Sequence, residues 1–192
     1  MTSEWVRTGA DGVERCWWCG EDPLYVRYHD EEWGTTLHGD DALFERMTLE
    51  AFQSGLSWLT ILRKREAFRA AFAGFAIERV AAFTTADEAR LMADAGIVRN
   101  RAKIGAAIGN ARAALEVDEG LDALLWSVAP TGPRPRPATL ADVPATSPES
   151  VAMAKALKRR GFVFVGPTTA YALMQATGMV DDHVADCFRA IR

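Results

Sequence analysis

Metal-binding side chains occur at the two ends of this chain. Cys16, Cys19 and His29 lie near the start, whereas His183 and Cys187 lie near the end with an H-x₃-C spacing. On a helix, residues i and i+4 share one face, so the C-terminal pair could bind one ion while N-terminal residues complete a tetrahedron. The spacing therefore predicts one fold in which a structural zinc joins the termini.

Two other interpretations fit the same residues. Cysteine is often a small buried hydrophobic residue, and histidine is often hydrogen-bonded inside a core, so no single one of these residues indicates a metal. A disulfide between Cys16 and either Cys19 or Cys187 is the second alternative. We find no signal-peptide pattern at the N-terminus, and we therefore expect reduced thiols in a reducing cytosol.

Composition and charge exclude a few classes of protein. The 192 residues are 49% hydrophobic and 25% charged, which allows one substantial core, and no apolar run is long enough to span a membrane. The formal net charge is −4, whereas nucleic-acid-binding domains are usually basic. Basic residues do cluster at 63–65, 99–103 and 155–160, and these three patches could share one face.

Helical periodicity extends over nearly the whole chain and predicts an all-α fold. A capping-box pattern at Thr85 and Glu88 precedes a helix that reaches about Ala95. Ser147-Pro148 begins another helix, which is expected to end near Gly161.

Two segments interrupt the helical pattern. Residues 162–165, Phe-Val-Phe-Val, are the only candidate for a strand. Residues 129–138 are rich in proline, which indicates a surface connection within one compact unit because the proposed zinc site needs both ends of the chain together.

One predicted helix carries an acidic residue on its apolar face. In the segment 41–54, Glu50 falls within the same arc of about 120° as Leu43 and Met47. Burying an unpaired carboxylate costs several kcal/mol. Glu50 must therefore pair with an arginine or line a cavity that receives a ligand, and the break after this helix brings Trp58 close to its end.

Aromatic residues gather in an irregular segment near the N-terminus. The segment contains Trp17, Trp18, Tyr25, Tyr28 and Trp33, interleaved with the turn-forming residues Gly20, Pro23 and Gly34. Core packing explains most tryptophans, but an aromatic segment opposite a buried glutamate also suits a pocket for a flat, electron-poor ring. Stacking would supply affinity there, and the carboxylate would select rings with an amino group on their edge.

The segment from Asp94 to Ile104 joins two predicted helices. Gly96 is expected to end the first, and the second begins with free backbone N–H groups beside Arg99, Arg101 and Lys103. A plain corner between two helices is one interpretation. The segment is also similar to the hairpin of a helix-hairpin-helix element, which binds DNA phosphates through backbone amides without reading the bases.

Several short motifs are distributed over most of the chain. They are Glu14-Arg15-Cys16, Asp22-Pro23-Leu24-Tyr25, Tyr28-His29-Asp30-Glu31-Glu32-Trp33-Gly34, Gly55-Leu56-Ser57-Trp58, Lys155-Ala156-Leu157-Lys158-Arg159-Arg160-Gly161-Phe162, and Phe164-Val165-Gly166 followed by Asp182-His183. This combination resembles the 3-methyladenine DNA glycosylase I family. The resemblance implies a helix-hairpin-helix DNA glycosylase fold, with two helical lobes around a base-binding cleft. It also implies a single glycosylase domain at 14–192 after a flexible extension at 1–13.

The resemblance implies a closed, structural zinc site that performs no chemistry. Its ligands fall on Cys16, His29, His183 and Cys187, so that the metal joins the termini. Cys19 is then surplus, although its spacing from Cys16 leaves it as an alternative fourth ligand.

The resemblance also assigns residues to the base and to DNA. The base-contacting carboxylate falls on Glu50 and the stacking rings on Tyr28 and Trp58, while the other aromatic residues nearby are Trp18, Tyr25 and Trp33. Leu56 would fill the gap left by an extruded nucleotide, and the DNA-binding hairpin would use Gly96, Arg99, Arg101 and Lys103. Phe52 and Pro167 depart from the family pattern, and Phe52 could change the packing beside Glu50.

The implied activity is hydrolytic release of 3-methyladenine from double-stranded alkylated DNA by a monomer. Methylation at N3 weakens the glycosidic bond, so the enzyme must mainly flip and hold the lesion. Glu50 would accept hydrogen bonds from the amino edge and stabilise positive charge while water attacks the sugar. Asp182 lies beside a zinc ligand, which favours a supporting role over catalysis.

Two other functions fit parts of the sequence. His29-Asp30-Glu31 with Cys16 and Cys19 resembles the motif of a zinc deaminase, but the cysteine pair precedes the histidine and lacks its leading proline. A non-catalytic, zinc-containing helix-hairpin-helix module that binds DNA is the second alternative. It leaves Glu50 and the aromatic segment without a purpose.

Overall fold

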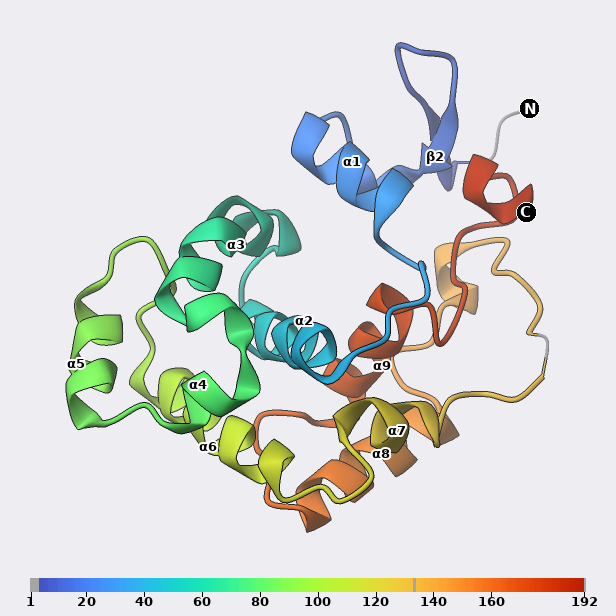
Figure 1. Ribbon diagram of the computed structural model, residues 1–192. Helices are drawn as coiled ribbons and strands as arrows, with labels where there is room; N and C mark the ends of the chain where they lie inside the picture. Colours follow the sequence, from blue (N-terminus) through green and yellow to red (C-terminus); the bar gives the residue numbers. More distant parts are fainter. Residues whose placement is uncertain (1–3, 133, 192) are drawn as a thin grey trace.

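The computed structural model describes residues 4–132 and 134–191. Within them the chain is mostly helical, as predicted, with nine α-helices, four 3₁₀ helices and one two-stranded sheet (Figure 1). The α-helices are Pro23–Glu31 (α1), Asp40–Gln53 (α2), Trp58–Ala71 (α3), Ile77–Ala81 (α4), Thr85–Ala93 (α5), Arg101–Leu115 (α6), Leu121–Trp126 (α7), Pro148–Arg159 (α8) and Pro167–Ala176 (α9). The 3₁₀ helices are Trp17–Cys19 (η1), Ala73–Phe75 (η2), Leu140–Asp142 (η3) and Phe188–Ile191 (η4). None of the helices in these ranges is long and apolar enough to cross a membrane.

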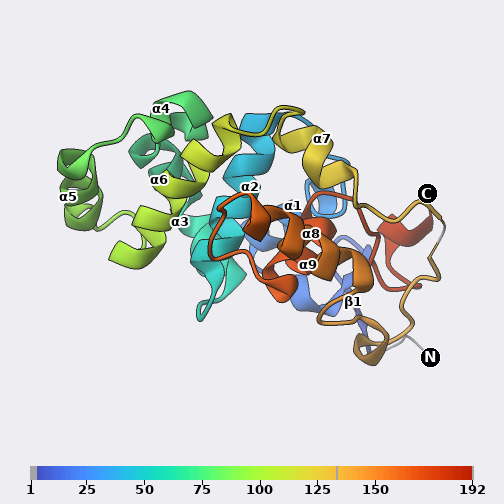
Figure 2. The same cartoon turned by 90° about the horizontal axis from the view of Figure 1, so that it is seen from below.

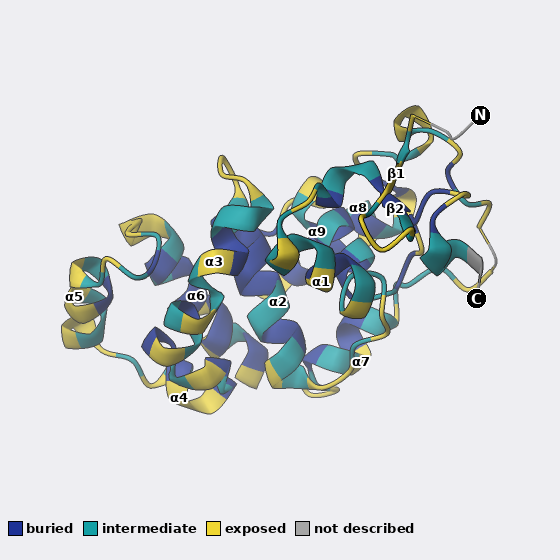
Figure 3. Ribbon diagram, turned by 90° about the horizontal axis from the view of Figure 1, so that it is seen from above, coloured by how far each residue is buried: buried dark blue, intermediate teal, exposed yellow. Residues whose placement is uncertain are grey.

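Helix α2 lies at the centre of the molecule. It contacts α3, α4, α6, α7 and α9, and its buried residues include Leu43, Met47 and Glu50. Figure 1 shows α3 to α6 on one side of α2 and α7 to α9 on the other, and Figure 3 shows the buried faces turned inward. The burial of Leu43, Met47 and Glu50 is therefore confirmed, but Leu49 and Phe52 outside the predicted arc are buried too, because neighbours surround the central helix.

The N-terminal residues form a small hairpin that the sequence did not predict. Val6–Thr8 (β1) pairs antiparallel with Glu14–Cys16 (β2), and the ring of Trp5 packs edge-on against Trp17 at 5.1 Å. A flexible extension at 1–13 before a single domain at 14–192 stays a prediction, although within the extension β1 has a strand partner. Figure 2 shows that both termini lie at the same end of the molecule.

Two local predictions were wrong. The residues 162–165 form an irregular loop between α8 and α9 and not a strand, because the side chain of Asn110 bonds both backbone groups of Val163 where a strand partner would be needed, at 3.0 and 2.9 Å. The capping box before α5 uses Thr84 and Asp87, one residue earlier than predicted.

The helix that begins after Ser147 is confirmed. Ser147 caps α8, Pro148 is its first residue, and the chain turns at Gly161 with φ +85°. The proline-rich connection before it contacts the C-terminal segment, where the backbone N–H of Ala185 donates to the carbonyl of Pro137 at 2.9 Å. The connection is therefore attached to the end of the chain and does not simply cross the surface.

Replacing Asn110 with alanine should lower the free energy of unfolding by about 1–3 kcal/mol, because both backbone groups of Val163 lose their partner. Asn110 is only 3% exposed, so water replaces the amide poorly. Urea denaturation at neutral pH measures the change. A loss below about 0.5 kcal/mol, the range of ordinary surface substitutions, would contradict this role.

Candidate active site and metal centre

A cavity of about 300 Å³ opens beside the C-terminal end of α2. It is walled by residues from η1, α1, α2, α3 and α9, together with the segment around η3. The lining residues are mainly aromatic or apolar and are Trp17, Trp18, Tyr25, Tyr28, Trp33, Glu50, Gln53, Trp58, Leu140, Val143, Ala172, Gln175 and Asp182. All five residues predicted to bind a base therefore lie around one cavity, together with Glu50.

Glu50 reaches this cavity from the buried face of α2. The side chain is 6% exposed, and burial raises the pKa of its carboxyl group from 4.5 to about 7, although the positive charge of Arg46 opposes the shift. Arg46 is occupied elsewhere, because its guanidinium donates to the hydroxyl of Tyr28 and to Glu32, both at 3.2 Å. Among the described residues Glu50 makes no hydrogen bond or ion pair, so the carboxylate faces the cavity and not an arginine.

The aromatic residues form a connected wall. Trp18 lies at its centre, with ring centroids 5.1 Å from Tyr25 and 4.9 Å from Trp33. The rings of Tyr28 and Trp58 are 5.5 Å apart and inclined by 48°. A base between two parallel rings needs about 7 Å, twice the contact distance of about 3.5 Å. In this conformation the two rings leave no room for a base between them, so a base would stack on one face of the wall. The expectation that Tyr28 and Trp58 stack on the base stays a prediction.

Three polar or charged cavity residues were absent from the predicted base-binding set. Gln53 comes from the last turn of α2, Gln175 from α9, and Asp182 from the segment after α9. Asp182 accepts hydrogen bonds from the hydroxyl of Tyr171 at 2.7 Å and from the amide of Gln175 at 2.8 Å. Asp182 was expected to support a metal ligand, but it lies in the cavity wall. Periodicity gives no signal for such residues, because they follow or end helices.

Phe52 lies outside the cavity lining. It therefore does not change the pocket directly, as its departure from the family pattern had suggested. It is fully buried and packs against Phe68, with ring centroids 4.8 Å apart. Its ring therefore fills the core on the other side of α2 from Glu50.

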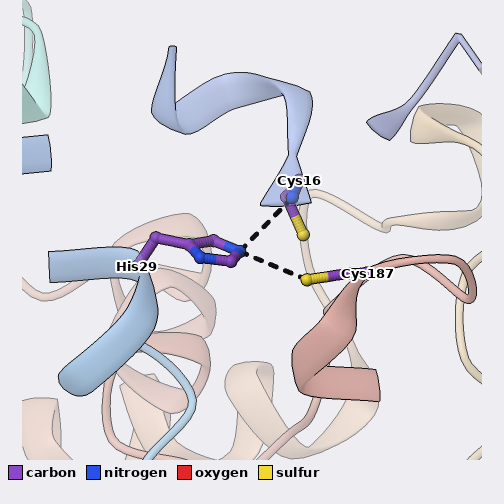
Figure 4. Close-up of side chains that lie close together, drawn as sticks. All are labelled: Cys16, His29 and Cys187. Carbon is purple, nitrogen blue, oxygen red and sulfur yellow. Dashed lines mark hydrogen bonds between the residues drawn. The ribbon is translucent and has the colours of Figure 1, made fainter. Parts of the chain in front are cut away.

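Three of the four predicted metal ligands form a buried cluster. The ligand atoms of Cys16, His29 and Cys187 all lie within 4.8 Å of one another. Figure 4 shows Cys16 on β2, His29 on α1 and Cys187 just before η4, with Nε2 of His29 3.4 Å from the sulfur of Cys187. The neighbouring Cys16 thiol and His29 lower the pKa of Cys187 below its ordinary value. Residues from both ends of the chain therefore meet as predicted.

His183 lies beside this cluster. Its ring centroid is 5.2 Å from that of His29, and its Nε2 is buried without a hydrogen-bond partner among the described residues. Residues 181–187 are not helical, so the expectation that His183 and Cys187 share a helix face was wrong. His183 instead packs against Gly34, where a Cβ atom would lie 2.6 Å from the ring.

Each histidine has one nitrogen fixed by a carboxylate. Nδ1 of His29 lies 2.8 Å from Asp30, and Nδ1 of His183 lies 2.8 Å from Asp181. Metal-bound histidines usually carry such a partner on the nitrogen away from the metal. Asp181, and not Asp182, is therefore the carboxylate that holds the ring of His183.

Cys19 lies apart from the cluster. Its thiol donates to the carbonyl of Cys16 at 3.2 Å, and its sulfur is outside the group of close ligand atoms. The deaminase hypothesis needed Cys19 as a ligand and Glu31 in the site, but Glu31 is exposed at the end of α1. The geometry therefore does not support a deaminase.

The residues predicted to bind DNA occupy two turns. Leu56 is 40% exposed in the turn between α2 and α3. Lys103 braces this turn, because its ammonium donates to the carbonyls of Phe52 and Ser54 at 2.9 and 2.8 Å. Its charge is therefore used within the protein, and the expectation that it contacts phosphate has no support from this geometry.

The second turn joins α5 to α6. Asp94 and not Gly96 caps the end of α5, and the backbone N–H of Gly96 donates to the Asp94 carboxylate at 2.7 Å. Lys64 of α3 holds the turn by donating to the carbonyl of Gly96 at 3.0 Å. Arg99 and Arg101 are exposed, with Arg101 3.8 Å from Glu88. Both remain candidates for DNA contact.

Comparisons with known proteins identify the family of this chain. Residues 18–190 match the family model described as methyladenine glycosylase. The chain is 48% identical to DNA-3-methyladenine glycosylase 1 of Escherichia coli K12, over 91% of this chain and 96% of the relative. A crystal structure of 3-methyladenine DNA glycosylase I superposes with a TM-score of 0.87, at 46% identity over 91% of this chain and 98% of the other. A variant of such an enzyme in complex with 3-methyladenine also superposes with a TM-score of 0.87, at 35% identity over 93% and 98%. The chain belongs to the methyladenine glycosylase family.

Proposed function

We propose that this protein is a DNA-3-methyladenine glycosylase, which hydrolyses the N-glycosidic bond of the methylated base as the first step of base-excision repair. The observation that carries the proposal is Glu50, a buried carboxylate without a protein partner in an aromatic cavity. Relatives with this name and a related structure with 3-methyladenine bound support the same activity.

The cavity suits an electron-poor base that has been rotated out of the duplex. A cationic ring is attracted to the faces of tyrosine and tryptophan by about 0.5–2 kcal/mol beyond the contact itself, and an unmodified base gains less. The ionised Glu50 accepts hydrogen bonds from the amino edge of the adenine, so a base without an amino group leaves the buried carboxylate unpaired. Flipping costs a few kcal/mol, and only the methylated ring recovers that cost.

The enzyme does not need to protonate the methylated base for the glycosidic bond to break. Methylation at N3 already places positive charge on the base, and Glu50 stabilises that charge while water attacks the sugar. The residues that line the cavity include no lysine, and a strand-cleaving route would need an amine nucleophile. We therefore infer a monofunctional hydrolase.

The substrate is double-stranded alkylated DNA, bound by a monomer in the bacterial cytosol. Leu56 is placed to enter the gap left by the flipped nucleotide, because its turn directly follows the helix of Glu50. The turn at Gly96, with Arg99 and Arg101 exposed beside it, would serve as a helix-hairpin-helix contact to phosphate. The two helical lobes are then α3 to α6 and α7 to α9, with α2 between them.

One structural zinc would be held by Cys16, His29, His183 and Cys187. The buried Nε2 of His183 without a partner and the carboxylates on both Nδ1 atoms fit a metal site. Two thiolates and two imidazoles are a set of donors typical of closed zinc sites. Such a metal would stabilise the meeting of the chain ends and supply no catalytic water.

The alternative is a non-catalytic DNA-binding module with the same zinc. It predicts affinity for duplex DNA without release of any base. The measurement that separates the two is mass spectrometry of bases freed from methylated DNA.

Replacing Glu50 with glutamine should reduce release of 3-methyladenine at least tenfold, because the amide keeps the shape and loses the charge. Glu31, an exposed carboxylate, gives the matched control Glu31→Gln, which should release the base at the wild-type rate. Single-turnover assays on methylated duplex DNA measure both. Equal rates for Glu50→Gln and the wild type would remove Glu50 from the mechanism.

The pKa of about 7 for Glu50 predicts a pH dependence. The ionised form accepts the amino hydrogens, so the rate should rise up to about pH 7 and fall about tenfold per pH unit in the acid range. Because the folded pKa lies above the unfolded one, the wild type should lose stability relative to Glu50→Gln as pH rises from about 4.5 to 7, by roughly 3 kcal/mol. Thermal melts across this range measure the difference, and parallel curves would contradict a buried carboxylate.

Changing Cys187 to serine should remove about one zinc per chain and lower thermal stability. The matched control is Cys19→Ser, which alters a buried thiol outside the cluster and should keep the metal. Elemental analysis and calorimetry measure the two quantities. A wild-type protein that is fully stable after chelation would overturn the structural zinc.

A further inference from the structure

Exposed apolar side chains are rare in this protein and some lie close to the cavity. In the parts of the chain that the structure covers, the exposed large hydrophobic residues are Leu56, Leu115, Leu140, Val163 and Phe164. Leu140 is 47% exposed and also lines the cavity, so it is located at the rim. Leu56 lies beside the rim, because the amide of Gln53, another lining residue, donates to its carbonyl at 3.1 Å.

The two leucines border the cavity from different segments of the chain. Gln53 and Trp58 line it next to Leu56, whereas Leu140 and Val143 line it from the η3 segment that follows the proline-rich connection. Figure 2 shows the turn between α2 and α3 and the η3 turn projecting from the same edge of the molecule. A duplex that approaches this edge to insert a base into the cavity therefore meets both turns.

The η3 turn is held rigid although its leucine is exposed. The carboxylate of Asp142 accepts from the backbone N–H and the hydroxyl of Thr139 at 2.8 and 2.9 Å, and from the N–H of Ala138 at 3.1 Å. On the preceding side, Pro137 is tied to Ala185. A leucine fixed in water at a cavity rim gains free energy only when a ligand covers it.

Charge decides which part of DNA the turn can contact. The hydrogen bonds from Thr139 lower the pKa of Asp142, so the turn is anionic at neutral pH and repels phosphate. The side chain of Leu140 therefore suits the apolar faces of a sugar or a base. Proteins that distort DNA often place such apolar residues against unstacked bases.

We propose that Leu140 is a second DNA-contacting residue, which packs on the sugar and base next to the flipped nucleotide, at the part of the cavity rim that η3 forms. The inference rests on the proposed glycosylase function and adds a residue to its DNA surface. Leu56 and Leu140 then contact the distorted strand from two different turns at the cavity rim. The η3 turn, which follows the proline-rich connection, accordingly contributes to substrate binding.

The test compares Leu140→Ala with Leu115→Ala, which shortens a leucine of similar exposure (52%) at the end of α6. Fluorescence anisotropy measures affinity for a duplex that contains a stable abasic-site analogue, and quenching of tryptophan fluorescence measures affinity for free 3-methyladenine. Leu140→Ala should weaken duplex binding about fivefold, as expected for the loss of a half-buried leucine contact. Because Leu140 also lines the cavity rim, affinity for the free base should fall as well, but by a smaller factor than affinity for the duplex, and Leu115→Ala should match the wild type in both.

Two results would overturn the proposal. Unchanged duplex affinity would mean that Leu140 does not contact DNA, and an equal loss of base affinity would make it a cavity wall only. Leu140→Met, which keeps an apolar side chain, should restore duplex binding and so excludes a folding defect. A wild-type protein that releases no 3-methyladenine would refute the proposed function. Binding to the abasic duplex does not require base release, so it would still show whether Leu140 contacts DNA.

Discussion

The packing of residues 181–187 against α1 is the contact on which the site depends. Two consecutive residues of α1 belong to different sites, since His29 is part of the cysteine cluster and Tyr28 lines the cavity. The C-terminal segment does the same, with Asp182 in the cavity wall and His183 beside the cluster. Whatever holds the chain ends together therefore also sets the distance between two walls of the cavity, without entering the chemistry.

Glu50 imposes the second constraint. A carboxylate on the central helix raises the free energy of the folded protein at neutral pH, because burial without a partner disfavours the charged form. Arg46 lies one turn earlier and is the obvious partner, but Tyr28 and Glu32 occupy it. The folded state thus keeps an acceptor unpaired, which is what a ligand with amino hydrogens and positive charge can use.

The two turns of the proposed DNA-binding edge come from different kinds of structure. Leu56 stands on a turn braced by Lys103, a residue first expected to bind phosphate. Leu140 lies on a turn held by Asp142, just after the proline-rich connection. In both turns a charged side chain binds backbone groups and an apolar side chain stays exposed. For Lys103, closeness to the turn in sequence therefore overstated its availability to DNA.

The sequence by itself determined most of the helices and the position of Glu50 on the buried face of α2, because periodicity is a local property. The scarcity of metal-binding residues indicated only that the two chain ends meet, and the choice of Cys16 and His29 over Cys19 came from the family resemblance. Only the tertiary structure decided which loops complete the cavity. Gln175 near the end of α9, Asp182 after α9 and Leu140 on η3 carry no periodic signal, and they line the cavity only because the fold brings these segments together with α1 and α2. The same holds for the residues 162–165, whose β-forming composition was overridden when Asn110 supplied the backbone partners that a strand would need.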